Sequence, residues 1–399
     1  MSKIWKNDNW LVSEYNFKHD GITKKIAKNF KIHDATLRDG EQTPGVVFRK
    51  DEKVEIARLL SEAGIHRIEA GMPAVSKDDR DAIEEIKKRG YKSEILAFAR
   101  ATIGDIELCN DCGVDGVVIE VPIGKPKLEN QFGWTVDNVI EKSLKTIERA
   151  KQLGLYTVFF PYDTTRADED DLTKLISAVT ANVCPDSIGI VDTMGCVNRI
   201  GLDYLMNKFK SECDLELEFH THNDFGLGVA NSIHAILNGF NTVHGCVNGM
   251  GERTGNASIE EIVAVMKMLY GVDLGIDLRK LIEACDFVQK ASGFKLAVNK
   301  PILGTANYIR ESGIGVECLF NSPLTMFATN PSYYGKSSKM VLGKKSGIAS
   351  IEIVLKDNNI ILDDLDKKKA ILADVKQFGT DMKRNVTNEE FLEILKKYI

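Results

Sequence analysis

Between residues 29 and 286, short apolar runs alternate regularly with segments of helical periodicity, and this alternation is what most limits the fold. The runs are rich in β-branched and aromatic residues, as buried parallel strands are. Eight strand–helix units over about 250 residues are typical of a (β/α)8 barrel. The runs are Lys31–Leu37, His66–Met72, Ser93–Arg100, Gly116–Ile123, Thr157–Tyr162, Ser187–Thr193, Glu216–Thr221 and Thr242–Asn248. We therefore predict an α/β fold built on a TIM barrel.

A doubly wound open sheet is the main alternative for such an alternation. That fold usually carries a glycine-rich dinucleotide-binding turn after its first strand. Here the first run ends at Leu37 and continues into Arg38-Asp39-Gly40-Glu41, which is no such turn. The barrel is therefore the favoured architecture.

The composition along the chain predicts three parts. Residues 1–28 are polar and without a clear period, so we expect an N-terminal extension there. Residues 29–286 hold the alternation and are expected to form the catalytic barrel. Residues 287–399 begin rich in Gly, Ser, Asn and Pro and then become helical and charged. For them we expect a linker or lid and a small, mainly helical region.

The net charge and the cysteine pattern indicate which kinds of partner and which cellular compartment suit this chain. A net charge of −6 over 399 residues leaves no basic surplus for nucleic acid or an anionic membrane surface. No apolar run is long enough to span a bilayer. Eight cysteines are scattered without a disulfide framework, and the first residues lack the apolar core of a signal peptide. We expect a cytoplasmic enzyme that acts on small molecules.

Polar residues gather at the ends of the first and seventh runs, where barrel enzymes place their active sites. His220 and His222 are one residue apart at a strand end, so both imidazoles point to the same face. Asp39 follows the first run and adds a hard oxygen. One carboxylate and two imidazoles with open positions suit Mg²⁺, Mn²⁺, Zn²⁺ or Co²⁺ acting as a Lewis acid. Arg38, beside Asp39, offers a cation for an oxyanion or a carboxylate.

Three motifs in order along the expected barrel resemble signatures of the isopropylmalate and homocitrate synthase family. They are Leu37-Arg38-Asp39-Gly40-x-Gln42 with Lys53 after it, His220-x-His222-Asn223-Asp224-x-Gly226-x-Gly228, and Gly249-x-Gly251-Glu252-Arg253-x-Gly255-Asn256. Two further stretches, at residues 39–48 and 69–74, lean toward the short homocitrate synthases. The resemblance covers the whole barrel.

The resemblance implies a Claisen-type condensation of an acyl-CoA, usually acetyl-CoA, with a 2-oxo acid, followed by hydrolysis of the thioester. It implies that Asp39, His220 and His222 hold the divalent metal and that Asn256 is a weaker or indirect ligand. Arg38 would stabilise the charge that develops on the attacked carbonyl oxygen. A segment beyond the barrel would join the partner subunit's active site, so we expect a homodimer.

The same resemblance suggests which side chains bind the substrates. Thr193, at the end of the sixth run, would hydrogen-bond the carboxylate of the oxo acid. Gln42 and Glu252 would lie around the metal and the acyl group. Arg100, at the end of the third run, is a further candidate for substrate binding.

Two departures from the family pattern concern proton transfer. Tyr162 stands where these synthases usually carry a glutamate after the fifth strand, and residues 310–315 lack the two histidines of the corresponding family segment. The reaction still needs a base for the α-proton of the acyl-CoA. We take Tyr162 as the candidate base inside the barrel and Glu311 as the candidate outside it.

Several other functions stay open on the sequence. The closest are synthases of the citrate (Re), citramalate or isopropylmalate type. A metal-dependent hydroxyacyl-CoA lyase would share the barrel, but it places a cysteine in the loop after the eighth strand, where Met250 is nearest here. A paralogue without catalytic activity, which binds only metal and oxo acid, is the remaining alternative.

Overall fold

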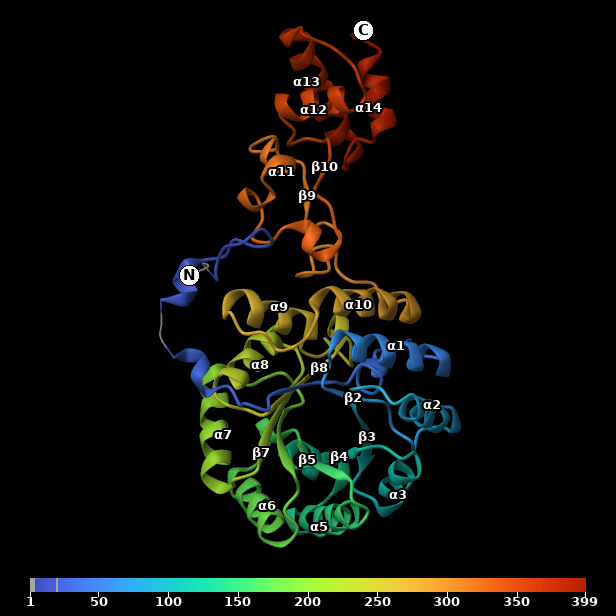
Figure 1. The fold of residues 1–399 in the computed structure, drawn as a ribbon, viewed down its shortest axis with the longest axis vertical. Coiled ribbons are helices and arrows are strands. Elements are labelled where there is room, and N and C mark those ends of the chain that lie inside the picture. The colour runs from blue at the N-terminus through green and yellow to red at the C-terminus, as the bar shows by residue number, and fades with distance from the viewer. Residues whose placement is uncertain (1–3, 19–20) are drawn as a thin grey trace. The chain divides into compact units, whose positions relative to one another are not determined.

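The computed structural model describes residues 4–18 and 21–399 of the chain. Its first eight strands form a closed parallel barrel in sequence order (Figure 1). They are β1 (Lys31–Asp34), β2 (Arg67–Glu69), β3 (Glu94–Arg100), β4 (Gly116–Pro122), β5 (Tyr156–Tyr162), β6 (Ser187–Asp192), β7 (Glu216–Thr221) and β8 (Thr242–Gly245). The barrel closes where β1 pairs with β8, with His33 opposite His244. The predicted (β/α)8 fold is confirmed.

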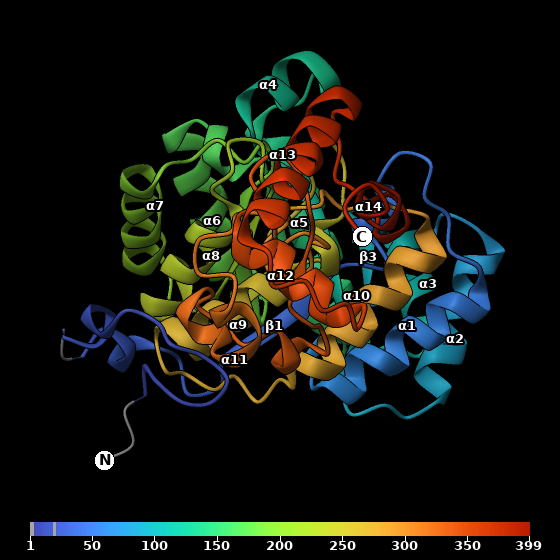
Figure 2. The ribbon, with the colours of Figure 1, turned by 90° about the horizontal axis from the view of Figure 1, so that it is seen from above.

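Amphipathic helices surround the barrel, and their ends follow local capping chemistry. Ser76 accepts a hydrogen bond from the Asp79 amide at the start of α2, and Thr102 accepts one from Asp105 at the start of α3. Helices α1 and α10 lie side by side in both ribbon views (Figures 1 and 2). The helices of this part are α1 (Lys50–Ala63), α2 (Lys77–Lys88), α3 (Ile103–Asp111), α4 (Lys125–Lys127), α5 (Val136–Gln152), α6 (Glu169–Asn182), α7 (Arg199–Glu212), α8 (Gly228–Leu237), α9 (Ile259–Leu269) and α10 (Leu278–Ser292).

The inside of the barrel differs from one side to the other. Strands β3 to β6 contribute an apolar cluster of Leu96, Phe98, Val118, Val158, Phe160 and Val191. Strands β7, β8, β1 and β2 contribute buried charges instead. Glu218 accepts hydrogen bonds from Arg67 (2.7 Å) and Ser187 (2.7 Å) and pairs with His244 (2.6 Å). His33 pairs with Glu69 at 2.9 Å. We call these two sides the apolar half and the polar half.

The chain divides into two compact units. Asn16–Leu296 form the barrel unit, so α10 belongs to it although the sequence pattern ended the barrel at residue 286. Ala297–Ile399 form the second unit together with the first residues of the chain, up to Tyr15. The described N-terminal residues pair with its middle segment, because Leu11 N–H donates to the Ala328 carbonyl at 2.9 Å.

The second unit is mainly helical. A parallel pair of short strands, β9 (Ile309–Arg310) and β10 (Lys339–Met340), precedes most of its helices. Its helices are α11 (Cys318–Asn321), α12 (Ile348–Asp357), α13 (Leu365–Met382) and α14 (Asn388–Leu395). Ile351, Ile371, Val375 and Phe391 are wholly buried between the last three helices. Among the described helices of the chain, none is long and apolar enough to cross a bilayer.

Candidate active site

One carboxylate and two imidazoles meet at the C-terminal end of the barrel. Asp39 Oδ2 lies 3.4 Å from His220 Nε2 and 3.5 Å from His222 Nε2. His220 and Thr221 end β7 and His222 follows it, so the alternation of the strand turns both rings toward Asp39 in the loop after β1. All three side chains are buried. The structure thus brings together the three residues expected to bind metal.

The donor set fits a divalent cation. Nδ1 of both histidines and Oδ1 of Asn256 are buried without a hydrogen-bond partner in the described chain. Asn256 Nδ2 donates to the Met250 carbonyl at 3.0 Å, which fixes the amide group and leaves its oxygen free. Burial lowers the pKa of His220 and His222, so both rings are neutral at pH 7 and can offer lone pairs. One carboxylate, two imidazoles and an amide oxygen suit Mg²⁺, Mn²⁺, Zn²⁺ or Co²⁺.

A second group, His33, Glu218 and His244, also brings three ligand atoms close together deeper in the barrel. Its members are already paired with other side chains. Glu218 carries the Arg67 guanidinium as well as His244, and His33 is held by Glu69. The Arg67 guanidinium thus balances the negative charge of Glu218 without a metal ion. The group around Asp39 is the better candidate for a metal.

Arg38 is held rigidly next to the candidate metal ligands. Its Nε donates a short hydrogen bond to Glu69, and its Nη1 lies 3.6 Å from Asp39 Oδ2. The guanidinium carbon lies 4.3 Å from the centre of the Phe98 ring. Because Glu69 is also bonded to His33, the position of the Arg38 cation is set by the barrel interior.

Eight of the candidate residues line one cavity of about 310 Å³ at the barrel mouth. They are Arg38, Asp39, Gln42, Tyr162, Thr193, His220, His222 and Glu252. Thr193 Oγ1 accepts a hydrogen bond of 2.7 Å from the Asp163 amide, so its own proton is available for an anion. Asn256 lies beside this cavity through its bridge to His222.

Within the barrel unit, Arg100 is not brought into this cavity. Arg100 pairs with Asp105 through two hydrogen bonds of 2.8 and 2.9 Å, and 60% of its side chain is exposed. The acidic first turn of α3 therefore holds the guanidinium, and Arg100 is not among the cavity residues. Glu311 belongs to the second unit, where it accepts hydrogen bonds from the Lys345 amide and Asn385.

The cavity also contains charged residues that the sequence reasoning did not select. Glu120 lies on β4, Lys127 ends the short helix α4, and Arg253 lies in the loop after β8. In the described chain, no hydrogen-bond partner is found for the Glu120 carboxylate. Burial raises the pKa of Glu120 to about 7, although the Arg38 guanidinium opposes this rise. Its signal in the sequence is one acidic residue within the apolar run Gly116–Ile123.

Tyr162 lies in the cavity as a proton donor rather than an acceptor. Burial, and next the neighbouring carboxylate of Glu120, raise the pKa of the Tyr162 phenol above its ordinary value. The phenol therefore keeps its proton at neutral pH. A phenolate base at this position is disfavoured.

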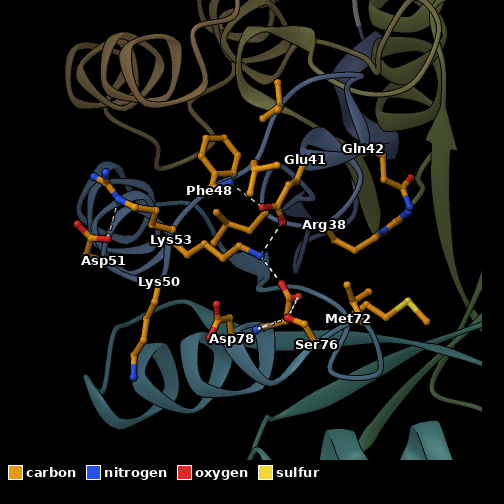
Figure 3. A pocket seen from close by; sticks show the side chains of 16 residues that line it. Arg38, Glu41, Gln42, Phe48, Lys50, Asp51, Lys53, Met72, Ser76 and Asp78 are labelled. Atoms are coloured by element: carbon orange, nitrogen blue, oxygen red, sulfur yellow. Dashed lines mark hydrogen bonds and ion pairs between the residues drawn. The ribbon is translucent and has the colours of Figure 1, made fainter.

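A larger cavity of about 670 Å³ adjoins the first (Figure 3). Arg38 and Gln42 line both cavities. Lys53 lies in the wall of this larger cavity, where its Nζ is 2.6 Å from Glu41 and 2.5 Å from Asp79. This bridge ties the loop after β1 to α2, which explains why a lysine follows the first motif.

Comparison with known proteins gives the chain relatives over nearly its whole length. The sequence model of the HMGL-like family matches residues 29–288. The homocitrate synthase AksA of Methanothermobacter thermautotrophicus is 37% identical, over 93% of this chain and 94% of the relative. The (R)-citramalate synthase CimA of Methanocaldococcus jannaschii is 37% identical, over 92% and 74%.

Solved structures share the fold at low sequence identity. The hydroxymethylglutaryl-CoA lyase of Pseudomonas aeruginosa superposes with a TM-score of 0.62 at 19% identity, over 68% of this chain and 95% of that one. With a matching family model across the barrel and curated synthases aligned over nearly all of the chain, this protein belongs to the HMGL-like family, in the group of homocitrate, citramalate and isopropylmalate synthases.

Proposed function

We propose that the protein is an acyl-CoA:2-oxo acid C-acyltransferase of the homocitrate synthase type. It condenses the acetyl group of acetyl-CoA with a 2-oxo acid and hydrolyses the thioester to release CoA. The observation that carries the proposal is the meeting of Asp39, His220 and His222 in a cavity beside the fixed cation of Arg38. The relatives named homocitrate synthase support it.

Asp39, His220 and His222 would hold a divalent metal, with Asn256 offering its free amide oxygen. Such an ion supplies Lewis acidity to the carbonyl group of the oxo acid. Mg²⁺, Mn²⁺, Zn²⁺ and Co²⁺ all suit this donor set.

The side chains around this site have distinct tasks. The Arg38 guanidinium faces the position where the carbonyl oxygen becomes negative, and Glu69 keeps it there. The Thr193 hydroxyl donates to the carboxylate of the oxo acid. Gln42 and Glu252 line the cavity around the acyl group. The apolar rings of Phe98 and Phe160 limit the water that reaches the reacting atoms.

The larger cavity next to Arg38 and Gln42 supports a place for the arm of acetyl-CoA. Its volume of about 670 Å³ lies within the usual range of ligand pockets. Val47 and Val75 line it and are 78% and 67% exposed, so the cavity offers apolar contact for a pantetheine chain.

We also expect a homodimer and a cytoplasmic location, as the sequence led us to predict.

Other synthases of this group are the first alternative, because relatives named citramalate and isopropylmalate synthase align over a similar share of the chain. A hydroxyacyl-CoA lyase is disfavoured by the loop after β8. Met250 is wholly buried there, and burial raises the pKa of the neighbouring Cys246 far above its ordinary value. Neither residue offers a reactive thiolate.

The proposal is tested by measuring thiol release from acetyl-CoA in the presence of Mn²⁺ and a panel of 2-oxo acids. We expect CoA to be released with 2-oxoglutarate or a close homologue. Release with oxaloacetate, pyruvate or 2-oxoisovalerate alone would assign the citrate, citramalate or isopropylmalate type instead. No release with any of these acids would contradict the proposed function and favour the paralogue without activity.

A further inference from the structure

The condensation requires a group that removes the α-proton of the acyl-CoA, and the cavity limits the choice. Three carboxylates line it: Asp39, Glu120 and Glu252. Asp39 lies between two imidazoles and belongs to the candidate metal ligands. Glu252 stands at the rim, with 59% of its side chain exposed and Arg253 within 3.7 Å. Glu120 is the carboxylate that remains.

The position of Glu120 is set by the barrel strands. It lies on β4 in register with Phe160 of β5, and the pair of Pro122 and Tyr162 lies two residues further toward the mouth. Glu120 is thus placed one step deeper than Tyr162 and still lines the cavity. The Arg38 guanidinium and the Lys127 ammonium both act on its charge.

Glu120 differs from the wholly buried glutamates Glu69 and Glu218 inside the barrel. Glu69 is bonded to Arg38 and His33, and Glu218 to Arg67, Ser187 and His244. For the Glu120 carboxylate, the described chain offers no hydrogen-bond donor. The Glu120 side chain is only partly buried and lines the cavity, so its carboxylate is accessible to a ligand bound there. It is free to bind a proton from a substrate.

We propose that Glu120 is the general base of this enzyme and accepts the α-proton of the acyl-CoA. The C–H bond breaks, its electron pair forms the carbon–carbon double bond of the enolate, and the thioester oxygen takes the negative charge. The enolate carbon then bonds to the oxo carbon of the 2-oxo acid, whose oxygen becomes an alkoxide beside Arg38. The protonated Glu120 returns its proton to that oxygen, so no external acid is consumed. This inference rests on the proposed function.

The test compares three variants of the full-length protein loaded with Mn²⁺, using the acid on which the unmodified enzyme acts. We expect Glu120→Gln to lower kcat for thiol release by about 10²–10⁴-fold. Binding of Mn²⁺ and of the oxo acid, measured by calorimetry, should not change. Glu120→Asp should keep part of the activity and show a larger isotope effect with deuterated acetyl-CoA. In Glu120→Ala, added formate should restore turnover, which a merely structural role would not allow.

Glu141→Gln is the matched control, because Glu141 lies on the outer face of α5 with 61% of its side chain exposed. It should leave kcat unchanged. Unaltered turnover in Glu120→Gln would overturn the assignment while the proposed function stood. A loss of Mn²⁺ or oxo acid binding in that variant would also overturn it, since Glu120 would then be a ligand. Thermal melting of each variant separates these outcomes from misfolding. An inactive unmodified enzyme would contradict the proposed function, and this inference with it.

Discussion

The two halves of the barrel interior are filled in different ways, one by apolar side chains and the other by paired charges. In the apolar half, Leu96, Val118 and Val158 fill the space between strands without any polar atom. In the polar half, Glu218 and Glu69 are buried, but each is bonded to a cation and to a histidine. Fully paired charges serve as a scaffold there. Glu120, a carboxylate at the mouth end of the apolar half, has no such partners, and it is the one that we assign to chemistry.

The largest effect is expected from removing a candidate metal ligand at the top of the polar half. Asp39→Asn keeps the shape of the side chain but removes the negative charge between His220 and His222. We expect thiol release to fall by roughly 10³-fold or more, because the polarising ion is bound poorly. Calorimetric titration with Mn²⁺ measures the binding. Tight binding with full activity would show that these residues are not the ligands.

The next effect tests the scaffold role of the polar half. Arg67→Ala leaves the wholly buried Glu218 without its guanidinium partner, whose Nη1 lies 2.7 Å from the carboxylate. Breaking a buried pair on one side costs about 3–5 kcal/mol, so the barrel's urea unfolding transition should shift strongly. The double variant Arg67→Met with Glu218→Leu should recover much of the loss. If Arg67→Ala were as stable as the unmodified protein, the pair would not be a scaffold.

A smaller effect is expected on the pH dependence of the free energy of unfolding, which the polar half should change and the apolar half should not. Burial alone would raise the pKa of Glu69, but Arg38 and His33 hold it at about 2, and burial lowers the pKa of His33 to about 4. Glu69 thus stabilises the fold above its ordinary pKa of 4.5 and loses this contribution as the pH falls toward 2. His33 resists protonation in the fold, so stability also falls between pH 6.5 and 4.

We therefore expect the destabilisation caused by Glu69→Gln to stay constant from about pH 7 to about pH 5 and to shrink as urea unfolding is measured from there down to about pH 3. Leu96→Ala, in the apolar half, is the control, and its destabilisation should be the same at every pH. A Glu69→Gln effect that is equally independent of pH would contradict the stabilising role of the charge.

The smallest effect is expected at Arg100, outside both halves. Its ion pair with Asp105 is exposed, so Arg100→Ala should change the stability by about 0–1 kcal/mol. Turnover and KM should stay the same, because the guanidinium is not part of the cavity. A raised KM for the oxo acid would restore Arg100 as a substrate-binding residue.

The sequence predicted the fold and the grouping of Asp39, His220 and His222 because strand ends of a barrel meet at one place. It did not select Glu120, and it assigned Arg100 to the site, for one physical reason. A strand buried on both faces reads as a continuous apolar run, so the direction of a charged residue within or after it cannot be read from alternation. The base was sought only at Tyr162 and Glu311, whereas the unpartnered carboxylate stands one strand away from Tyr162.

The pairing of Leu11 with Ala328 makes the second unit discontinuous in the chain. Asn330 Nδ2 also donates to the carbonyl of Asp8, 322 residues away in sequence. During synthesis the barrel segment can fold as soon as it leaves the ribosome. The N-terminal residues can pair only later, after the segment around Ala328 has been synthesised. A folded barrel between them shortens the free chain that must close this loop, which lowers the entropy lost on closure. Removing the N-terminal residues up to and including Leu11 therefore changes the C-terminal unit and not the barrel.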